Sequence, residues 1–313
     1  TMRSSGLLEV TSTHYRFLPK LEKEHDFDEI RLENPVEVYA NEVAPLRKVR
    51  EALSNAVEQY PEVSPGSMAR MRLHDGVLSL QWDRLKYSKD RHLEINQLQT
   101  ATADATPFLL EPDVPKDIGV VIVHGFLASP AEVKGFAEKL CRHGYRVHGV
   151  RLKGHGTSPW DLRDRSWEDW QACVSQGYLL MASLTSKVVL VGFSTGGALV
   201  LRLAADRPAG LRGAVALAVP LKFQNKNMVF VPLVHRANRL VRWVSSYEGI
   251  MPFRASDYTE HPNVNYRHIP IRGLFELKRL VEELKNTLGQ VRCPVQLLQG
   301  DDDPVVVPRS AEL

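Results

Sequence analysis

The sequence predicts an α/β fold with a doubly wound, mostly parallel sheet over its last two thirds. From residue 106 onward, short apolar runs rich in β-branched residues alternate with amphipathic segments of helical length. Such alternation is typical of a parallel sheet with helices on both faces. The runs are continuously apolar, as in the stretch 118–123, and this pattern indicates strands buried on both faces.

The expected elements follow one another in a regular order. Serine before an apolar repeat favours a helix start, and glycine after it favours a helix end. Ser129-Pro130 and Gly144 therefore bound the first helix, and Ser166 opens the second. The expected strands are 118–123, 145–150, 187–191, 211–219 and 294–298, and the expected helices are 129–143, 167–181 and 199–205.

Residues 1–105 are more polar and are interpreted as a separate, small α+β region of unknown role. Apolar residues three or four positions apart between Leu46 and Tyr60 predict one helix. The segment 71–82, with Asp75-Gly76 as its turn, is typical of a β-hairpin, and 91–98 is expected to add a strand. The segment 100–106 has the composition of a linker, so the second domain is expected to span 106–313.

Composition excludes several classes of protein. The chain has 40 basic and 37 acidic residues, and a net charge of +3 is too small to indicate nucleic-acid binding. No apolar run approaches the roughly 20 residues of a membrane-spanning helix, and no signal peptide is apparent. Cys141, Cys173 and Cys293 lack disulfide or metal-ligand spacing. We expect a cytoplasmic protein with free thiols and no metal, of undetermined oligomeric state.

The stretch 188–197 carries the strongest chemical signal. Its G-x-S-x-G motif, centred on Ser194, follows an apolar strand and opens a helix, which is the context that presents a serine nucleophile on a strained turn. Gly192 and Gly196 leave room for neighbouring backbone, and the helix directs free N–H groups toward developing negative charge. The alternative is a glycine-rich turn with an incidental serine.

A second loop, His124-Gly125-Phe126, follows the first strongly apolar strand. Acyl transfer needs two donors for the oxyanion, and the expected donors are the backbone N–H groups of Phe126 and Thr195. His124 is expected to support this loop through hydrogen bonds rather than to act as a base.

A third loop, 301–303, holds three aspartates after the last expected strand. A carboxylate at such a position can orient a base histidine and stabilise its charged form. Asp303, directly before Pro304, is the expected acid. The alternative is an acidic loop that is only a solvated surface.

Together these motifs resemble the α/β-hydrolase fold, and within it bacterial carboxylesterases and monoacylglycerol lipases. The resemblance runs from about residue 107 to 313 and implies a serine esterase without a cofactor. It implies Ser194 as nucleophile, Asp303 as acid, Phe126 and Thr195 as oxyanion donors, and a structural His155. The segments that carry it are PFLLE (107–111), VVIVHGFLASP (120–130), RLKGHGTSP (151–159), W-x-x-W (167–170), VLVGFSTGG (189–197) and CPVQLLQGDDDPVVVP (293–308).

The base histidine of that pattern is not in its expected place. The resemblance puts it after the acid, and no histidine follows Asp303. His235, His261 and His268 precede the acid, which is the wrong order. We therefore expect the base in a further C-terminal piece beyond Leu313, and little activity from the 313 residues alone. The alternative is a broken triad in a non-catalytic binding protein.

Residues 221–288 are expected to form a small helical cap, with 11 basic and 6 acidic residues. A basic amphipathic helix around 233–244 is expected either to touch an anionic lipid surface weakly or simply to solvate its arginines. A second amphipathic helix, around 275–284, is expected to pack on the core. The expected acyl pocket is lined by Phe126, Leu127, Phe193 and Trp243.

These expectations converge on one activity. The sequence predicts hydrolysis of carboxylic esters with short-to-medium acyl chains, or of monoacylglycerols, through an acyl-enzyme on Ser194. An acyltransferase or a thioesterase with the same triad is the closest alternative, because only the acceptor differs. The expected partner is a small acyl ester or lipid.

Overall fold

The computed structural model describes residues 8–10, 15–17, 55, 63–222, 250–252, 263–303, 305–308 and 310. The chain divides into two compact units, Thr1–Val63 and Ser64–Leu313. In the first unit, strands β1 (Leu8–Val10) and β2 (Tyr15–Phe17) form an antiparallel pair. Apart from Asn55, the helix expected between Leu46 and Tyr60 lies outside the described residues.

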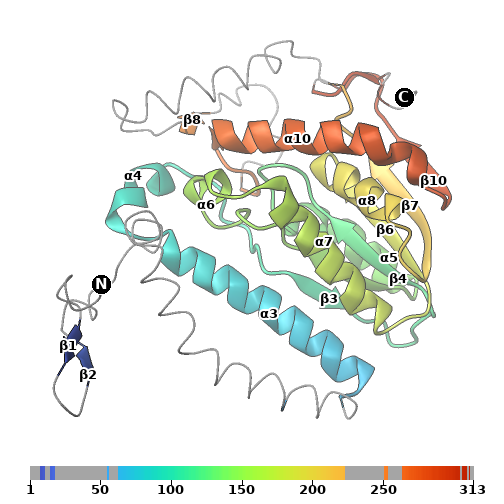
Figure 1. The fold of residues 1–313 in the computed structure, drawn as a ribbon. Helices are drawn as coiled ribbons and strands as arrows, with labels where there is room; N and C mark the ends of the chain where they lie inside the picture. The colour runs from blue at the N-terminus through green and yellow to red at the C-terminus, as the bar shows by residue number, and fades with distance from the viewer. Residues whose placement is uncertain are drawn as a thin grey trace. The chain divides into compact units, whose positions relative to one another are not determined.

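The second unit is built on a six-stranded sheet (Figure 1). Its strand order is β10-β7-β6-β4-β5-β3, and every neighbouring pair is parallel except β3 with β5. The five expected strands are confirmed with small shifts at their ends. The strands are β3 (Phe108–Leu110), β4 (Gly119–Val123), β5 (Arg146–Val150), β6 (Val188–Phe193), β7 (Leu211–Leu217) and β10 (Val295–Leu298).

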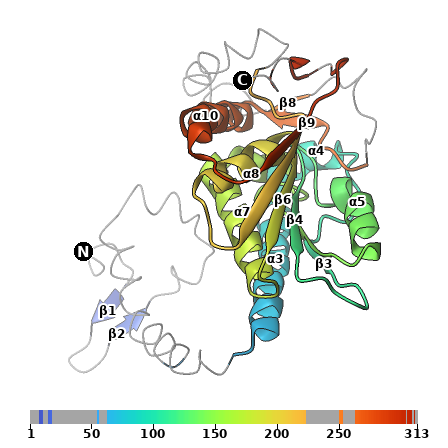
Figure 2. The ribbon, with the colours of Figure 1, turned by 90° about the vertical axis from the view of Figure 1, so that its right-hand side faces the viewer.

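Helices cover both faces of this sheet (Figure 2). Val120 and Ile122 of β4 pack toward Val133 and Ala137 of α5, whereas the residues between and after them belong to the larger core on the α7 and α8 side. A strand whose two faces each pack in an apolar core has no polar face, which explains the continuous apolar run in the sequence. The helices are α5 (Ala131–Arg142), α6 (Pro159–Arg163), α7 (Trp167–Ala182), α8 (Thr195–Ala205) and α10 (Ile271–Thr287).

Of the three helix ends predicted for α5 and α7, two are confirmed and one is wrong. Ser166 and Asp169 form the capping box that starts α7, as expected from the serine. Gly144, just past α5, has φ 89°, a conformation that glycine adopts without strain. The expected cap at Ser129 is wrong, because Pro130 occupies the cap position and no side chain caps α5.

The β-hairpin expected over 71–82 and the strand expected over 91–98 are wrong. Both segments are helical, in α3 (Pro65–Lys86) and α4 (Asp90–Gln97). Ser64 caps α3, accepting a hydrogen bond from the Ser67 N–H at 3.2 Å. Gly76 lies inside the helix, where glycine costs about 1 kcal/mol relative to alanine. Packing of α3 beside α7 (Figure 1) outweighs that local preference.

The compact unit that holds the sheet starts at Ser64, so it includes α3 and α4. The segment 100–106 has no regular secondary structure, but hydrogen bonds and burial hold it against the rest of the unit. The N–H groups of Thr102 and Ala103 both donate to the Asn263 carbonyl at 2.9 Å, and Ala105 is buried. Residues 64–105, expected from the sequence to belong to the N-terminal region, thus lie in the same unit as the sheet.

The expected cap is described only in part. Strands β8 (Ile250–Pro252) and β9 (His268–Pro270) form an antiparallel pair, followed by α10 and the short 3₁₀ helix η4 (Leu288–Gln290). The amphipathic helix expected around 275–284 is confirmed as α10. The basic helix expected at 233–244, with Trp243, lies outside the described residues. No helix in the described part of the chain is both long and apolar enough to cross a membrane.

Burial of α10 on α8 provides a test of this architecture. Leu280 is fully buried in the larger core, so Leu280→Ala is expected to lower the free energy of unfolding by about 2–5 kcal/mol. Leu85→Ala, at a position that is 66% exposed on α3, is the matched control and is expected to change it by less than about 0.5 kcal/mol. Urea unfolding followed by circular dichroism measures both, and equal effects would contradict the packing of α10.

Candidate active site

The carboxyl ends of β4 and β6 meet at the centre of the sheet. The two strands are parallel neighbours with Val123 opposite Gly192, and the chain continues from them to opposite sides, to β5 and to β7. Ligands of open α/β sheets bind at such a switch in strand order. The loop that starts at His124 and the turn at Ser194 both lie at this position.

Ser194 occupies the strained turn that the motif predicts. Its φ of 52° and ψ of −114° are unusual for a residue with a side chain, and α8 begins at the next residue. The Ser194 N–H donates to the Leu217 carbonyl at 2.7 Å, and the Ser194 carbonyl accepts from the Ala198 N–H at 3.1 Å. The turn is therefore held by backbone on both sides, while its side chain makes no hydrogen bond among the described residues.

Two glycines permit this turn. A Cβ on Gly192 would lie 2.2 Å from the Gly196 carbonyl oxygen, and one on Gly196 would lie 2.3 Å from the Val123 carbonyl oxygen. Both contacts are with backbone atoms, which cannot avoid the clash by changing rotamer as a side chain can. Any side chain at either position would therefore push α8 away from β4 or from its own strand.

The loop after β4 runs beside Ser194. A Cβ on Gly125 would come within 3.5 Å of the Ser194 Cβ, so the two backbones are close. The Gly125 N–H donates to Glu132 Oε2 at 2.7 Å, and the Leu127 carbonyl accepts from the Tyr266 N–H at 3.0 Å. Leu127 itself has φ 67°. These bonds fix the chain on either side of Phe126.

The two expected oxyanion donors lie on these adjoining segments. Thr195 is the first residue of α8, so its N–H has no partner inside the helix. Phe126 lies between the anchored Gly125 and Leu127, and its ring packs edge-on against Trp170 with centroids 5.9 Å apart. Among the described residues, no hydrogen bond occupies the Phe126 N–H.

His124 is buried and supports the loop, as expected from the sequence. Its Nδ1 donates to the Gly125 carbonyl at 2.9 Å, and its Nε2 accepts from the Leu152 N–H at 3.2 Å. Burial lowers the pKa of His124 to about 4, so the ring is neutral and its tautomer is set by these two bonds. Both nitrogens are engaged, which leaves neither to take a proton from Ser194.

His155 is equally buried and packs in the same aromatic group. Its ring lies 5.2 Å from that of His124 and 5.9 Å from that of Phe126, centroid to centroid. Burial holds the pKa of His155 well below its ordinary value. The Nδ1 atom is 3.1 Å from the Lys153 carbonyl oxygen, which ties the ring to its own loop.

Asp303 lies on the loop after β10, two strands from β6. Its Oδ1 accepts from the N–H groups of Val305 and Val306, both at 2.9 Å, and its Oδ2 accepts from the Gln299 side-chain amide at 2.9 Å. Asp301 and Asp302 are exposed. Of the three aspartates, Asp303 is therefore the one held in a fixed orientation at the same edge of the sheet as Ser194.

The histidines between the fourth and fifth expected strands do not complete the site among the described residues. His268, in β9, lies with Nδ1 at 2.8 Å from the Gln99 side-chain nitrogen, and burial lowers its pKa. His235 and His261 lie outside the described residues. No described histidine hydrogen-bonds to Ser194.

Comparison with known proteins decides the family. Residues 115–313, more than half of the chain, match the family described as serine aminopeptidase, S33. The chain belongs to this family. A thermostable monoacylglycerol lipase of Bacillus sp. (strain H-257) is 30% identical over 212 residues, which are 67% of this chain and 78% of the lipase. A carboxylesterase of Bacillus subtilis (strain 168) is 25% identical over 198 residues, 63% of this chain and 76% of that enzyme.

Solved structures share the fold of this S33 family member. The structure reported for the metagenome-derived lipolytic enzymes LipS and LipT has a TM-score of 0.58 and 25% identity, covering 68% of this chain and 82% of that one. A monoacylglycerol lipase of Paleococcus ferrophilus has a TM-score of 0.52 at 23% identity, covering 67% and 82%, and supports the fold alone. The predicted α/β-hydrolase fold and the predicted class, a carboxylesterase- or lipase-type serine hydrolase, are confirmed.

Sequence reasoning missed two residues that position the site of this S33 hydrolase. Glu132 anchors Gly125, and Tyr266 anchors Leu127 while its hydroxyl donates to the Gly154 carbonyl at 2.9 Å. An acidic residue in the first turn of the helix that follows the loop was a usable signal for Glu132. Nothing local marks Tyr266, because its partners lie more than a hundred residues earlier in the chain.

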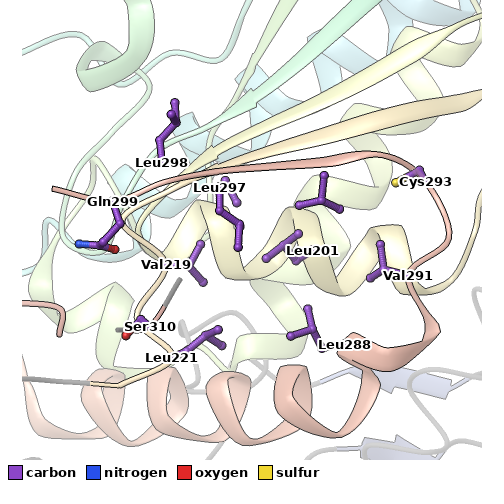
Figure 3. A pocket seen from close by; sticks show the side chains of 12 residues that line it. Leu201, Val219, Leu221, Leu288, Val291, Cys293, Leu297, Leu298, Gln299 and Ser310 are labelled. Carbon is purple, nitrogen blue, oxygen red and sulfur yellow. The ribbon is translucent and has the colours of Figure 1, made fainter. Parts of the chain in front are cut away.

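The expected acyl pocket is described in part. Phe193 is 39% exposed at the end of β6, whereas Leu127 is buried and Phe126 is half-buried. A separate apolar cavity of about 270 Å³ lies between β7, β10, α8 and η4 (Figure 3). Leu201, Val291 and Leu297 are among its lining residues, and it contains none of the expected catalytic or pocket residues.

The buried neutral histidines predict how stability depends on pH. Burial lowers the pKa of both His124 and His148 to about 4. The unfolded chain therefore binds protons at a pH where the folded chain does not, and the free energy of unfolding falls as the pH drops from about 6.5 toward 4. Each histidine is expected to contribute a loss of about 2 kcal/mol by pH 5.

Urea unfolding at about pH 7 and pH 5 measures this loss. His148, whose Nδ1 hydrogen-bonds to the Phe108 carbonyl at 2.9 Å, is the position to vary because it lies away from the proposed catalytic groups. His148→Gln is expected to reduce the loss between the two pH values by about 2 kcal/mol. The same pH dependence in the variant and the wild type would show that His148 is not buried in its neutral form.

Proposed function

We propose that this chain hydrolyses carboxylic esters through an acyl-enzyme on Ser194. The observation that carries the proposal is the backbone of Ser194, whose positive φ places this serine on a strained turn at the start of α8, beside the Gly125 loop. The relatives that carry the names monoacylglycerol lipase and carboxylesterase support the same reaction class.

In the proposed reaction, the Ser194 hydroxyl oxygen attacks the acyl carbonyl carbon. The carbonyl oxygen becomes an oxyanion, and the N–H groups of Phe126 and Thr195, with the positive end of α8, stabilise that charge. A histidine outside the described residues takes the serine proton and passes it to the leaving alcohol, with Asp303 orienting its ring. Water then attacks the acyl-enzyme, releasing the acid and restoring Ser194.

The proposed substrates are esters with short-to-medium acyl chains, or monoacylglycerols. The groups near Ser194 that are able to contact an acyl chain are apolar, namely Phe193, Leu127 and Phe126. An apolar surface distinguishes chains by only about 1–3 kcal/mol per methylene, so the preference is graded. Weak contact of the basic segment 233–244 with anionic lipid stays a prediction, because those residues lie outside the described part of the chain.

Replacement of the nucleophile gives the first test of this function. In the natural full-length protein, with any residues that follow Leu313, Ser194→Ala is expected to lower p-nitrophenyl ester turnover by several orders of magnitude and to abolish labelling by a fluorophosphonate probe, because loss of a triad nucleophile costs on the order of 10⁶ in kcat. The control Ser88→Ala, at an exposed serine, is expected to leave both unchanged. Retention of more than a few per cent of the activity by Ser194→Ala would remove Ser194 from the mechanism.

A chain-length series tests the substrate class. Turnover of p-nitrophenyl esters is expected to change gradually with acyl length and to favour short-to-medium chains, with monoacylglycerol cleaved better than emulsified triacylglycerol. Cleavage of an aminoacyl p-nitroanilide would indicate a peptidase instead. Transfer of the acyl group to an added alcohol, in preference to water, would indicate an acyltransferase. Activity confined to long-chain triacylglycerol at an interface would contradict the pocket proposed here.

A further inference from the structure

Asp83, on the α3 face that packs against the rest of the unit, is a buried carboxylate shared by two arginines. Its side chain is 8% exposed; Oδ2 accepts from Arg151 Nη2 at 2.6 Å, and Oδ1 accepts from Arg165 Nη2 at 3.0 Å. A buried carboxylate is retained only where such partners compensate its desolvation. The helix that carries it precedes the residues that match the S33 family, which begin at residue 115.

Both arginines belong to the segment that follows β5. Arg151 is the first residue after that strand; besides Asp83, its guanidinium donates to the His155 carbonyl at 3.3 Å and to Ser79 Oγ, also on α3, at 3.2 Å. Arg165 donates through Nε to Asp161 Oδ1 at 2.7 Å, and Asp161 is fully buried. Asp83 therefore holds the segment 151–165 at both of its ends, in a group of two arginines and two aspartates.

This segment in turn supports the loop with the proposed oxyanion donor. The Leu152 N–H donates to His124 Nε2, and the opposite nitrogen of His124 holds the Gly125 carbonyl. The Gly125 carbonyl belongs to the peptide group that contains the Phe126 N–H. The His155 ring also packs against the Phe126 ring. The position of that N–H thus depends on the position of the segment after β5.

We propose that Asp83 is a positioning residue for catalysis, which fixes the Phe126 N–H through Arg151, the 151–156 loop and His124. The proposal rests on the ester hydrolysis proposed above. Without the carboxylate, Arg151 and Arg165 would stay largely buried with one counter-charge fewer, which favours displacement of the segment that carries both. Asp83 touches no reacting atom, so its effect is on the geometry of the oxyanion donor.

Steady-state hydrolysis of p-nitrophenyl butyrate by the natural full-length protein, with any residues that follow Leu313, tests the proposal. Asp83→Asn is expected to lower kcat by about tenfold or more with KM within about twofold, because an oxyanion donor acts in the transition state. Asp83→Glu, which keeps the charge, is expected to recover part of the loss. Asp75→Asn makes the same change at an exposed position on α3 and is expected to match the wild type.

Hydrogen exchange provides a readout that does not need catalysis. Asp83→Asn is expected to speed exchange at amides 124–128 and 152–156 and to leave those of α8 unchanged. If the wild type hydrolyses no ester, the proposed function fails, and exchange alone decides whether Asp83 controls the loop. Arg151→Lys, which keeps the charge but loses the forked donors, is expected to act in the same direction if Asp83→Asn does not fold.

Two outcomes would overturn the proposal. One is wild-type kcat and wild-type exchange at 124–128 in Asp83→Asn. The other is a uniform increase in exchange across Ser64–Leu313, with kcat falling only in proportion to the folded fraction. The second outcome would show that Asp83 contributes to stability alone.

Discussion

The close approach of backbone to backbone between β4 and α8 is the constraint on which the proposed site depends. It exists because Gly192 and Gly196 have no side chains, so the first turn of α8 lies directly against the Val123 carbonyl. This proximity brings the loop after β4 beside Ser194 and gives two strands a common carboxyl edge. A site assembled from peptide groups in this way leaves the surrounding side chains free to shape the substrate pocket.

The side chains that support the loop through His124 differ in charge according to their distance from the loop. The ring beside the loop, His124, is neutral, with each nitrogen in a single role. The charged groups, Asp83, Asp161, Arg151 and Arg165, lie one layer farther out and are paired with each other. His124 therefore adds no fixed charge beside a developing oxyanion, while the paired charges behind it supply rigidity. The carboxylate that does contact the loop, Glu132, is engaged by the Gly125 N–H.

Local chemistry made much of the fold predictable. Apolar runs predicted the parallel strands, and the glycine spacing around Ser194 predicted the strained turn, because both signals act over a few residues. The hairpin expected around Gly76 was wrong because burial against α7 outweighs a turn-like dipeptide. The role of Asp83 was not predictable, since its partners lie 68 and 82 residues away in sequence. The assignment of Asp303 stays a prediction of the motif.

The positive φ of Ser194 has a consequence for the evolution and engineering of this fold. A side chain in that conformation stores strain that glycine would release, so the nucleophile position is not optimised for stability. Selection for robustness and selection for turnover therefore pull residue 194 in opposite directions. A variant library screened only for heat resistance would be enriched in chains that have lost the hydroxyl, and a screen of this fold has to reward both properties at once.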